Sequence, residues 1–372
     1  MLLSKLCTGE EIHRYQKSIV VNFTGMRRVL STSPNNGGFR EDLTAVFNND
    51  GTIGAGMAST LRAPTYGEHM ALVSEELGLD PDTSAGISTA AQMENVSIKT
   101  ESYKDITVTA IVTGGVEVNG GRVGDEASWD ELEKKPVEKP HLGTINIMLF
   151  INTDLTPGAL IRSLVTCTEA KTAALQELMA PSRYSRGLAT GSGTDSTTIV
   201  ANAESPITLE YAGKHCKLGE LIGKSVKEAV KEALYLQTDL CPERQRDVLR
   251  RVDRFGITTQ SLWQRMGENE LADYRKDRFA MCLETYFREE RLVSLVSLYA
   301  HMIDQTAWDL ITTEEAEGLA SFLLGAMMIP DLSDIKLKSG DKTEMIDAMI
   351  EALHNGLASL LKQHWKDKVI NE

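Results

Sequence analysis

A glycine and a threonine stand before an apolar run at residues 142–149, which read LGTINIML. The hydroxyl of Thr144 is a candidate nucleophile, and such a hydroxyl reacts well only when a base lies beside it. The alternative is that Thr144 is an ordinary strand residue, since β-branched threonine is common in strands. The charged segment at 125–141 carries two prolines and leads directly into this run. We expect that segment to form an exposed loop.

The stretch LATGSGTDSTTIVANA at 188–203 is the second place where the residue types suggest chemistry. Gly191 and Gly193 alternate with polar residues, and Thr194 and Asp195 follow at once. Successive backbone N–H groups in such a loop can form a nest that binds anions. The competing interpretation is a glycine-rich turn that enters a strand. The stretch is not a Walker A loop, because no Gly-Lys-Ser/Thr sequence follows.

A third polar segment, STSPNNGGFRED at 31–42, follows the strand-like residues before it. Asn36 and its neighbouring glycines tolerate left-handed backbone, so the segment is at least a turn. It is equally well interpreted as a rim that hydrogen-bonds an amide-rich ligand. The candidate donors and acceptors in that rim are Ser31, Thr32, Asn35 and Asn36. Asn146, within the strand that follows Thr144, joins them as a candidate substrate-binding residue.

Two titratable residues could activate a water molecule instead. Glu169 lies in a predicted helix, where it is either a solvated charge or a buried acid that faces a site. His215 stands just before another predicted helix, although a lone histidine is more often structural or exposed than catalytic. The chain has no HExxH sequence and no Cys/His cluster, so we expect no zinc site and no other metal site.

The elements that must position these residues fall into two groups. Before about residue 235, β-branched runs bounded by glycine, asparagine or proline predict strands at 18–23, 106–113, 144–152 and 196–203. Several runs are apolar without alternation, which indicates sheets covered on both faces. Apolar residues at helical spacing predict helices at 156–179 and 218–237. The expected fold class is α+β, a layered sandwich of mixed β-sheets covered by helices.

The remainder of the chain has the pattern of a helical bundle. Gly256 is placed to end one helix, and Thr312 with Glu315 predicts a capping box at the start of another. A polar connector is expected at 331–342, and an amphipathic stripe predicts a helix at 343–365. We therefore divide the chain into an α/β domain at 1–238 and a helical domain at 239–372.

Composition excludes several classes of function. The formal net charge is −14, so nucleic acid and anionic membranes are disfavoured as partners. No stretch approaches the roughly 20 apolar residues of a membrane span, and the N-terminus lacks the apolar core of a signal peptide. The chain has five cysteines without a CxxC pair, which favours a reducing cytoplasm over a secreted disulfide framework.

Six segments in one order, spread over about residues 15–234, resemble the adenosylcobinamide amidohydrolase family. The resemblance implies hydrolysis of adenosylcobinamide to adenosylcobyric acid and aminopropanol, a step of corrinoid salvage for cobalamin synthesis. The corrinoid is then the substrate, and no cofactor is required. The helical domain lies outside the resemblance and is a candidate for forming a homo-oligomer, covering the site or contacting another salvage protein. The six segments are VLSTSPNNGG, TVTAIVTGG, GTINIMLFIN, TEAKTAALQELMAPSRYS, ATGSGTDSTTIVAN and YAGKHCKLGELIGKSVKEAVKEAL.

A fainter similarity bears on mechanism. The segments around GTINIMLFINTDLTPGAL and ATGSGTDSTTIVANA are similar in layout to self-processing amidohydrolases of the D-aminopeptidase and ornithine acetyltransferase type. That similarity implies that the Gly143–Thr144 bond is cut and that Thr144 becomes the nucleophile. The freed α-amine, with a pKa of about 8, would serve as its base. The substrate carbonyl would be polarised by Thr194, by Asp195 or by backbone N–H groups of 191–195. At the nucleophile position, Thr144 stands where these amidohydrolases more often have serine.

Three alternatives stay open. The hydrolysis could instead use a water molecule activated by Glu169, Asp195 or His215. The protein could bind a corrinoid without turning it over, since asparagine- and glycine-rich loops suit a ligand bordered by amides. It could also be another self-processing amidase, such as a peptidase.

Overall fold

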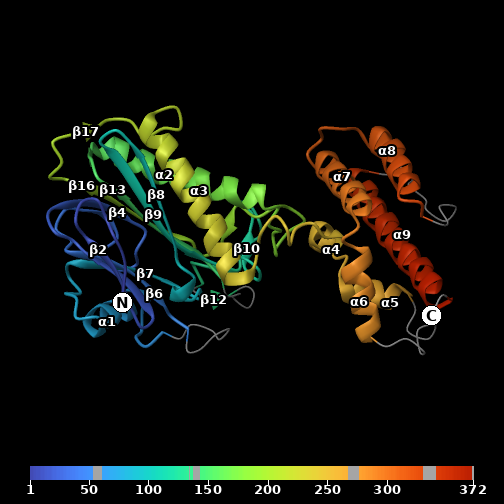
Figure 1. Ribbon diagram of the computed structural model, residues 1–372, viewed down its shortest axis with the longest axis horizontal. Helices are drawn as coiled ribbons and strands as arrows, with labels where there is room; N and C mark the ends of the chain where they lie inside the picture. The colour runs from blue at the N-terminus through green and yellow to red at the C-terminus, as the bar shows by residue number, and fades with distance from the viewer. Residues whose placement is uncertain (53–60, 134, 137–142, 267–275, 330–340, 371–372) are drawn as a thin grey trace. The chain divides into compact units, whose positions relative to one another are not determined.

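The computed structural model describes residues 1–52, 61–133, 135–136, 143–266, 276–329 and 341–370 (Figure 1). Within them the chain divides into two compact units, Met1–Cys241 and Pro242–Glu372. The first unit is built from strands and three long helices, and the second is helical. The polar connector expected at 331–342 falls almost wholly outside the described residues.

The first sheet of the N-terminal unit has five strands in the order β1-β2-β3-β6-β7. Only the β6–β7 pair is parallel, and the other neighbours are antiparallel. The strands are Leu2–Lys5 (β1), Glu11–Tyr15 (β2), Ser18–Asn22 (β3), Ala45–Asp50 (β6) and Ser84–Thr89 (β7).

The second sheet has six strands in the order β5-β4-β16-β13-β9-β8. Here β13 and β16 are parallel, whereas β13 and β9 are antiparallel, so the sheet is mixed as expected. The four predicted strands, which are β3 of the first sheet and β9, β13 and β16 of the second, are confirmed within one residue at every end. The strands are Arg27–Ser31 (β4), Gly38–Arg40 (β5), Ser97–Tyr103 (β8), Ile106–Gly114 (β9), Ile145–Ile151 (β13) and Ser196–Asn202 (β16).

The two sheets lie face to face between layers of helix (Figure 1). Apolar and polar residues do not alternate along β13 because both faces of the strand are covered. Met148 and Phe150 pack between the sheets, while Ile145, Ile147 and Leu149 pack against helices. A strand covered on both faces is apolar throughout. The helices on that outer face are α2 (Pro157–Glu177) and α3 (Lys217–Thr238), as predicted. The expected fold class, a layered α+β sandwich followed by helices, is confirmed.

A helix that we did not predict covers the other outer face. Helix α1 (Tyr66–Glu76) packs Met70 and Val73 against Val20 and Phe47 of the first sheet. Its N-terminus is a capping box, in which the Thr65 side chain accepts from the backbone N–H of Glu68 and the Glu68 side chain accepts in return. The Thr-x-x-Glu pattern is visible in the sequence and would have indicated this helix start.

Shorter elements complete the N-terminal unit. A 3₁₀ turn, η1 (Met93–Asn95), precedes β8. Strand pairs join β10 to β15, β11 to β12 and β14 to β17. The segment 125–141, expected to be an exposed loop, contains a pair of two-residue strands, and its last residues, 137–141, lie outside the description. These strands are Gly120–Gly121 (β10), Trp129–Asp130 (β11), Lys135–Pro136 (β12), Asp154–Leu155 (β14), Gly191–Ser192 (β15) and Thr208–Leu209 (β17).

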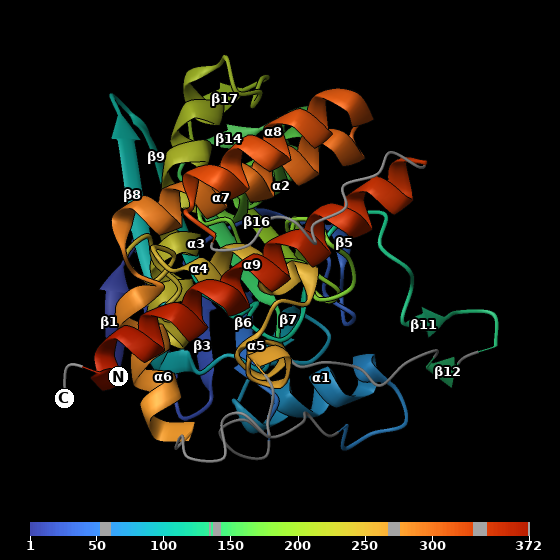
Figure 2. The same cartoon turned by 90° about the vertical axis from the view of Figure 1, so that its right-hand side faces the viewer.

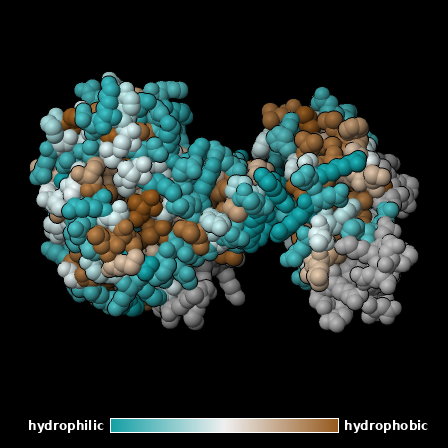
Figure 3. Space-filling model, in the orientation of Figure 1, coloured by the Kyte–Doolittle hydropathy of each residue, from teal (hydrophilic) through white to brown (hydrophobic). Residues whose placement is uncertain are grey.

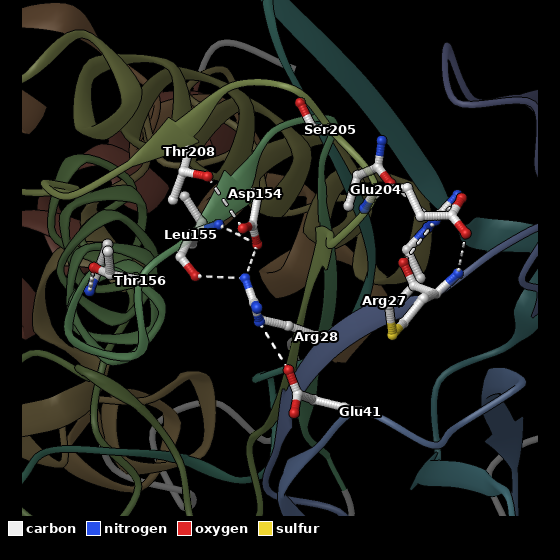
Figure 4. Close-up of polar contacts among 12 residues, drawn as sticks. Arg27, Arg28, Glu41, Asp154, Leu155, Thr156, Glu204, Ser205 and Thr208 are labelled. Atoms are coloured by element: carbon white, nitrogen blue, oxygen red, sulfur yellow. Dashed lines mark hydrogen bonds and ion pairs between the residues drawn. The ribbon is translucent and has the colours of Figure 1, made fainter.

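A polar cluster around Arg28 fixes the far end of the second sheet, where β13 passes into α2 (Figure 4). The Arg28 guanidinium bonds to the carboxylate of Asp154 and, at 2.9 Å, to that of Glu41. The hydrogen bond to Asp154, followed by that to Glu41, raises the pKa of Arg28. The Thr208 hydroxyl donates to the second Asp154 oxygen at 3.2 Å. The seven residues of β13, about 23 Å of strand, separate this cluster from Thr144.

We predict that Arg28→Met lowers the free energy of unfolding by about 1–3 kcal/mol, because it leaves a largely buried carboxylate without its cation. The Asp154 side chain is only 11% exposed. Urea unfolding measures the change. The control is Arg62→Met, whose ion pair with Glu76 is exposed on both sides and should contribute less than about 1 kcal/mol. Equal losses in the two variants would contradict the prediction.

The C-terminal unit packs α7, α8 and α9 side by side around one apolar core (Figures 1 and 2). Gly256 ends the first helical segment with a φ of +79°, and Thr312 and Glu315 form the capping box, so both predicted helix signals are confirmed. The helical elements are Val248–Val252 (α4), Asp253–Phe255 (η2), Thr259–Met266 (α5), Lys276–Tyr286 (α6), Glu290–Ala307 (α7), Thr313–Ala326 (α8) and Lys342–Ile370 (α9).

Surface character also differs between regions of this unit. Apolar side chains gather over α7 and α8 in Figure 3, where Leu298, Leu319 and Phe322 are exposed. Among the residues that the structure covers, no helix combines the length and apolarity needed to cross a bilayer.

Candidate active site

Thr144 lies at the entrance of β13, between the end of β9 and the start of β16. Its carbonyl oxygen accepts from the backbone N–H of Gly115 at 2.9 Å. Its hydroxyl donates to the carbonyl oxygen of Thr194 at 2.7 Å. The side chain is almost wholly buried, with 3% of the residue exposed. The hydroxyl is therefore held in one orientation by the loop that precedes β16.

The carbonyl oxygen of Gly143, which belongs to the peptide bond before Thr144, receives two hydrogen bonds. Asn119 Nδ2 donates to it at 2.7 Å, and the Thr194 hydroxyl donates at 3.2 Å. Two preorganised donors on one carbonyl oxygen form an oxyanion hole when a nucleophile attacks that carbonyl. The next residue, Thr144, carries a hydroxyl that could attack this carbonyl.

Only glycine fits at position 143. Its φ is +140°, and a Cβ atom there would lie 2.7 Å from the carbonyl oxygen of Gly115 and 3.1 Å from the Asn119 Cβ. L-residues rarely adopt such a backbone, and the approach to Gly115 leaves no room for a side chain. The glycine thus brings its carbonyl up to the two donors.

Asn119 is a site residue that sequence reasoning missed. It is buried, and Tyr184 Oη donates to its Oδ1 atom, which leaves Nδ2 to face Gly143. The backbone pairing of β10 with β15 places Gly120 opposite Ser192, so the residue before β10 lies near the loop after β15. The available signal was the cluster of glycines and asparagine at 114–121, which indicates a turn but not a role.

Asp195 holds the loop and the strand entrance together. Its Oδ1 atom accepts from the backbone N–H of Ile145 at 2.8 Å and from the Ser192 hydroxyl at 2.7 Å. Its Oδ2 atom accepts from the backbone N–H of Ser192 at 3.0 Å and from Lys171 Nζ. With four donors bound, this carboxylate acts as an anchor, and it has no acceptor site left for a water molecule that it would activate.

Gly191 and Gly193 lie in the same loop but for different reasons. A Cβ atom at Gly191 would lie 2.3 Å from Asp195 Oδ2, so the carboxylate requires glycine there. Gly193 has open space around the position of a Cβ atom. The two glycines and Thr194 and Asp195 are therefore brought to Thr144 as expected, although the expected anion nest stays a prediction.

Asn146 is fully buried between the sheets. Its Nδ2 atom donates to Asn48 Oδ1 at 2.7 Å and to the carbonyl oxygen of Ser88 at 3.0 Å. Its Oδ1 atom has no hydrogen-bond partner among the described residues. Asn146 thus lies two residues from Thr144, in a polar cluster within the sandwich.

The other predicted rim residues form hydrogen bonds with neighbouring segments of the fold. The Ser31 hydroxyl bonds to that of Thr198 at 2.7 Å, and the Thr32 hydroxyl accepts from the backbone N–H of Thr197 at 2.9 Å. The side-chain amides of Asn35 and Asn36 both donate to the carbonyl oxygen of Pro81. These bonds shape the turn after β4, and whether the turn also contacts a ligand stays a prediction.

Glu169 and His215 do not join the cluster around Thr144. Glu169 is 42% exposed at its side chain and faces Lys214 and Arg162, at 3.5 and 3.7 Å, so it is a solvated charge. His215 is exposed and precedes α3, whose 22 residues span about 33 Å. The opposite end of α3 is the one that approaches Thr144, because Gln237 lies beside Gly115.

Two further titratable groups of this unit, Cys167 and Asp125, have shifted pKa values. Burial raises the pKa of the Cys167 thiol to about 12, so it stays protonated at neutral pH. Burial alone would raise the pKa of Asp125, but a hydrogen bond from Ser182 and other donors lowers it below its usual value. No group of three or more potential metal-binding side chains occurs in the part of the chain that the structure describes.

Comparison with known proteins identifies the family of this chain. A protein of Methanocaldococcus jannaschii named uncharacterized protein MJ1613 is 35% identical over 232 residues, which cover 59% of this chain and 87% of that protein. The PH0078 protein from Pyrococcus horikoshii OT3 is a distant structural match, with 12% identity and a TM-score of 0.31 over 69% of this chain and 90% of that one. The family model for adenosylcobinamide amidohydrolase matches residues 3–242. The chain therefore belongs to the adenosylcobinamide amidohydrolase family, a family of hydrolases.

Proposed function

We propose that this protein hydrolyses the aminopropanol amide of adenosylcobinamide, releasing adenosylcobyric acid and aminopropanol, and that Thr144 is the nucleophile. Family membership supports the reaction. The observation that carries the mechanism is the pair of donors, Asn119 Nδ2 and the Thr194 hydroxyl, on the carbonyl oxygen beside the Thr144 hydroxyl. The corrinoid is the substrate, and the proposed chemistry uses no resident cofactor.

The first step opens the chain itself. The Thr144 hydroxyl oxygen attacks the Gly143 carbonyl carbon through a five-membered ring, and the two donors stabilise the oxyanion that forms. The bond from this carbon to the Thr144 nitrogen breaks, and the hydroxyl proton ends on that nitrogen. The result is an ester between Gly143 and the Thr144 side chain. Water hydrolyses this ester to give a Gly143 carboxylate and a free Thr144 hydroxyl and α-amine.

The second step repeats this chemistry on the substrate. The α-amine of Thr144 takes the hydroxyl proton as the oxygen attacks the amide carbonyl of the corrinoid side chain. Asn119 and Thr194 now donate to the substrate oxyanion, in the place that the Gly143 carbonyl held before. The proton passes to the leaving nitrogen of aminopropanol, and water then hydrolyses the acyl-enzyme ester. The same two donors therefore serve both steps.

The test is incubation of the purified full-length chain with adenosylcobinamide. We expect equal amounts of aminopropanol and adenosylcobyric acid, measured by chromatography of both products. Unchanged adenosylcobinamide would refute the proposal. Tight binding of the corrinoid without turnover would instead indicate a corrinoid-binding protein. Cleavage of small peptides, with the corrinoid left intact, would indicate a self-processing peptidase.

A further inference from the structure

The Thr144 site depends on one ion pair whose cation comes from a different layer of the fold. Lys171 projects from α2, and its Nζ atom bonds to Asp195 Oδ2. The two side chains are 12% and 11% exposed, so the pair is largely removed from water. We propose that Lys171 is a positioning residue of this site, acting on Thr144 through Asp195. This inference rests on the proposed function.

Asp195 connects Lys171 to the Thr144 site through two sets of hydrogen bonds. Its Oδ1 atom fixes the backbone N–H of Ile145, the residue directly after Thr144. Both of its oxygens hold Ser192, and the Ser192 hydroxyl accepts in turn from the backbone N–H of Thr194 at 3.3 Å. The carbonyl oxygen of Thr194 accepts the hydrogen bond from the Thr144 hydroxyl, and the Thr194 hydroxyl donates to the Gly143 carbonyl. One carboxylate thus sets both the nucleophile and one oxyanion donor.

The charge of Lys171 is what this arrangement requires. A carboxylate this far from water is unfavourable unless a cation or several donors compensate it. Other α2 side chains also reach the loop, but they bond to its backbone: the Thr172 hydroxyl donates to the carbonyl oxygen of Thr190, and Gln176 donates to that of Ala189. Without Lys171, the Asp195 carboxylate would keep its three uncharged donors and lose its only charged partner.

A merely structural role makes a different prediction. If Lys171 only stabilised the fold, its loss would act like the loss of any buried ion pair in the same unit. Arg27 supplies that comparison, because its ion pair with Glu10 is 4% and 0% exposed. Arg27 lies at the far end of the second sheet, opposite Asn202, and touches none of the groups around Thr144.

The experiment compares Lys171→Met with Arg27→Met in the full-length chain, using two measurements. The first is hydrogen exchange by mass spectrometry, read in peptides that cover β13 (Ile145–Ile151) and in peptides that span 189–197. The second is the steady-state kinetics of corrinoid hydrolysis. For Lys171→Met we expect faster exchange confined to those two segments. We also expect kcat to fall about 10- to 100-fold with KM little changed, as for a misplaced reacting group.

For Arg27→Met we expect lower thermal stability. Its kcat and its hydrogen exchange near Thr144 should equal those of the wild type. The inference is overturned if Lys171→Met leaves exchange in both segments unchanged, if its exchange rises evenly over the unit, or if KM carries the loss. Exchange needs no substrate, so it decides the role of Lys171 even if the wild type does not hydrolyse the corrinoid. That last result would refute the proposed function alone.

Discussion

Thr144→Ala is expected to abolish hydrolysis of adenosylcobinamide and to leave the chain in one piece. Under denaturing conditions the wild type should separate into residues 1–143 and 144–372, pieces of 143 and 229 residues. Alanine has no hydroxyl, so neither the attack on Gly143 nor the attack on the substrate can occur. Removing a catalytic nucleophile costs a factor of about 10⁶ in kcat in a well-studied hydrolase, so we expect a loss of at least about 10⁴-fold. Intact mass and product release measure the two effects.

Thr144→Ser is the matched control, because it keeps the hydroxyl and removes only a methyl group. We expect this variant to cleave itself and to turn over substrate. An active Thr144→Ala variant would exclude Thr144 as the nucleophile. An unbroken wild-type chain with full activity would remove the self-opening step and would favour activation of a water molecule instead.

More of the layered fold than of the candidate site could be predicted from local sequence patterns. Strand β13 could be predicted because six of its seven residues are apolar and Asn146 is the single polar one. Helix α1 was missed because its apolar stripe is short, although its capping box was available. The strands at the N-terminus of the chain were also not predicted, since several carry charged and polar residues on an exposed side.

Site residues could be predicted from the sequence where a local pattern marks them, but not where their role depends on contacts with residues distant in the sequence. Thr194 and Asp195 became candidates because they stand in a short stretch of unusual composition, and Thr144 because its segment is similar to self-processing amidohydrolases. Asn119 and Lys171 were missed because their roles exist only through contacts over 24 residues each, to Gly143 and to Asp195. A lysine within a helix and an asparagine within a turn look ordinary until the fold brings a carbonyl or a carboxylate to them.

Glu169 was a candidate site residue from the sequence, whereas Lys171 on the same helix was not. Glu169 and Lys171 stand two positions apart on α2, and residues with that spacing do not share a face of a helix. Glu169 faces Lys214 and solvent, while Lys171 reaches the loop before β16. Only the packing of α2 on the second sheet decides which of the two enters the site.

Asn119→Ala is expected to lower kcat about 100- to 1,000-fold, because it removes one of two donors from the oxyanion. KM should change little, since the lost hydrogen bond strengthens only as negative charge develops. Self-cleavage of a freshly made chain should slow as well, because the same donor contacts the Gly143 carbonyl. Thr194→Val removes the second donor, and its separate effect shows whether the two act as a unit.

The matched control for Asn119 is Asn49→Ala. Asn49 is also largely buried, and its amide donates to the Ser18 hydroxyl at 2.9 Å, away from Thr144. Its loss should lower stability and leave kcat unchanged. If both asparagine variants lost kcat in proportion to their stability, Asn119 would be a structural residue. If Asn119→Ala slowed hydrolysis but not self-cleavage, the two reactions would use different donors, and the single oxyanion site proposed for both would be wrong.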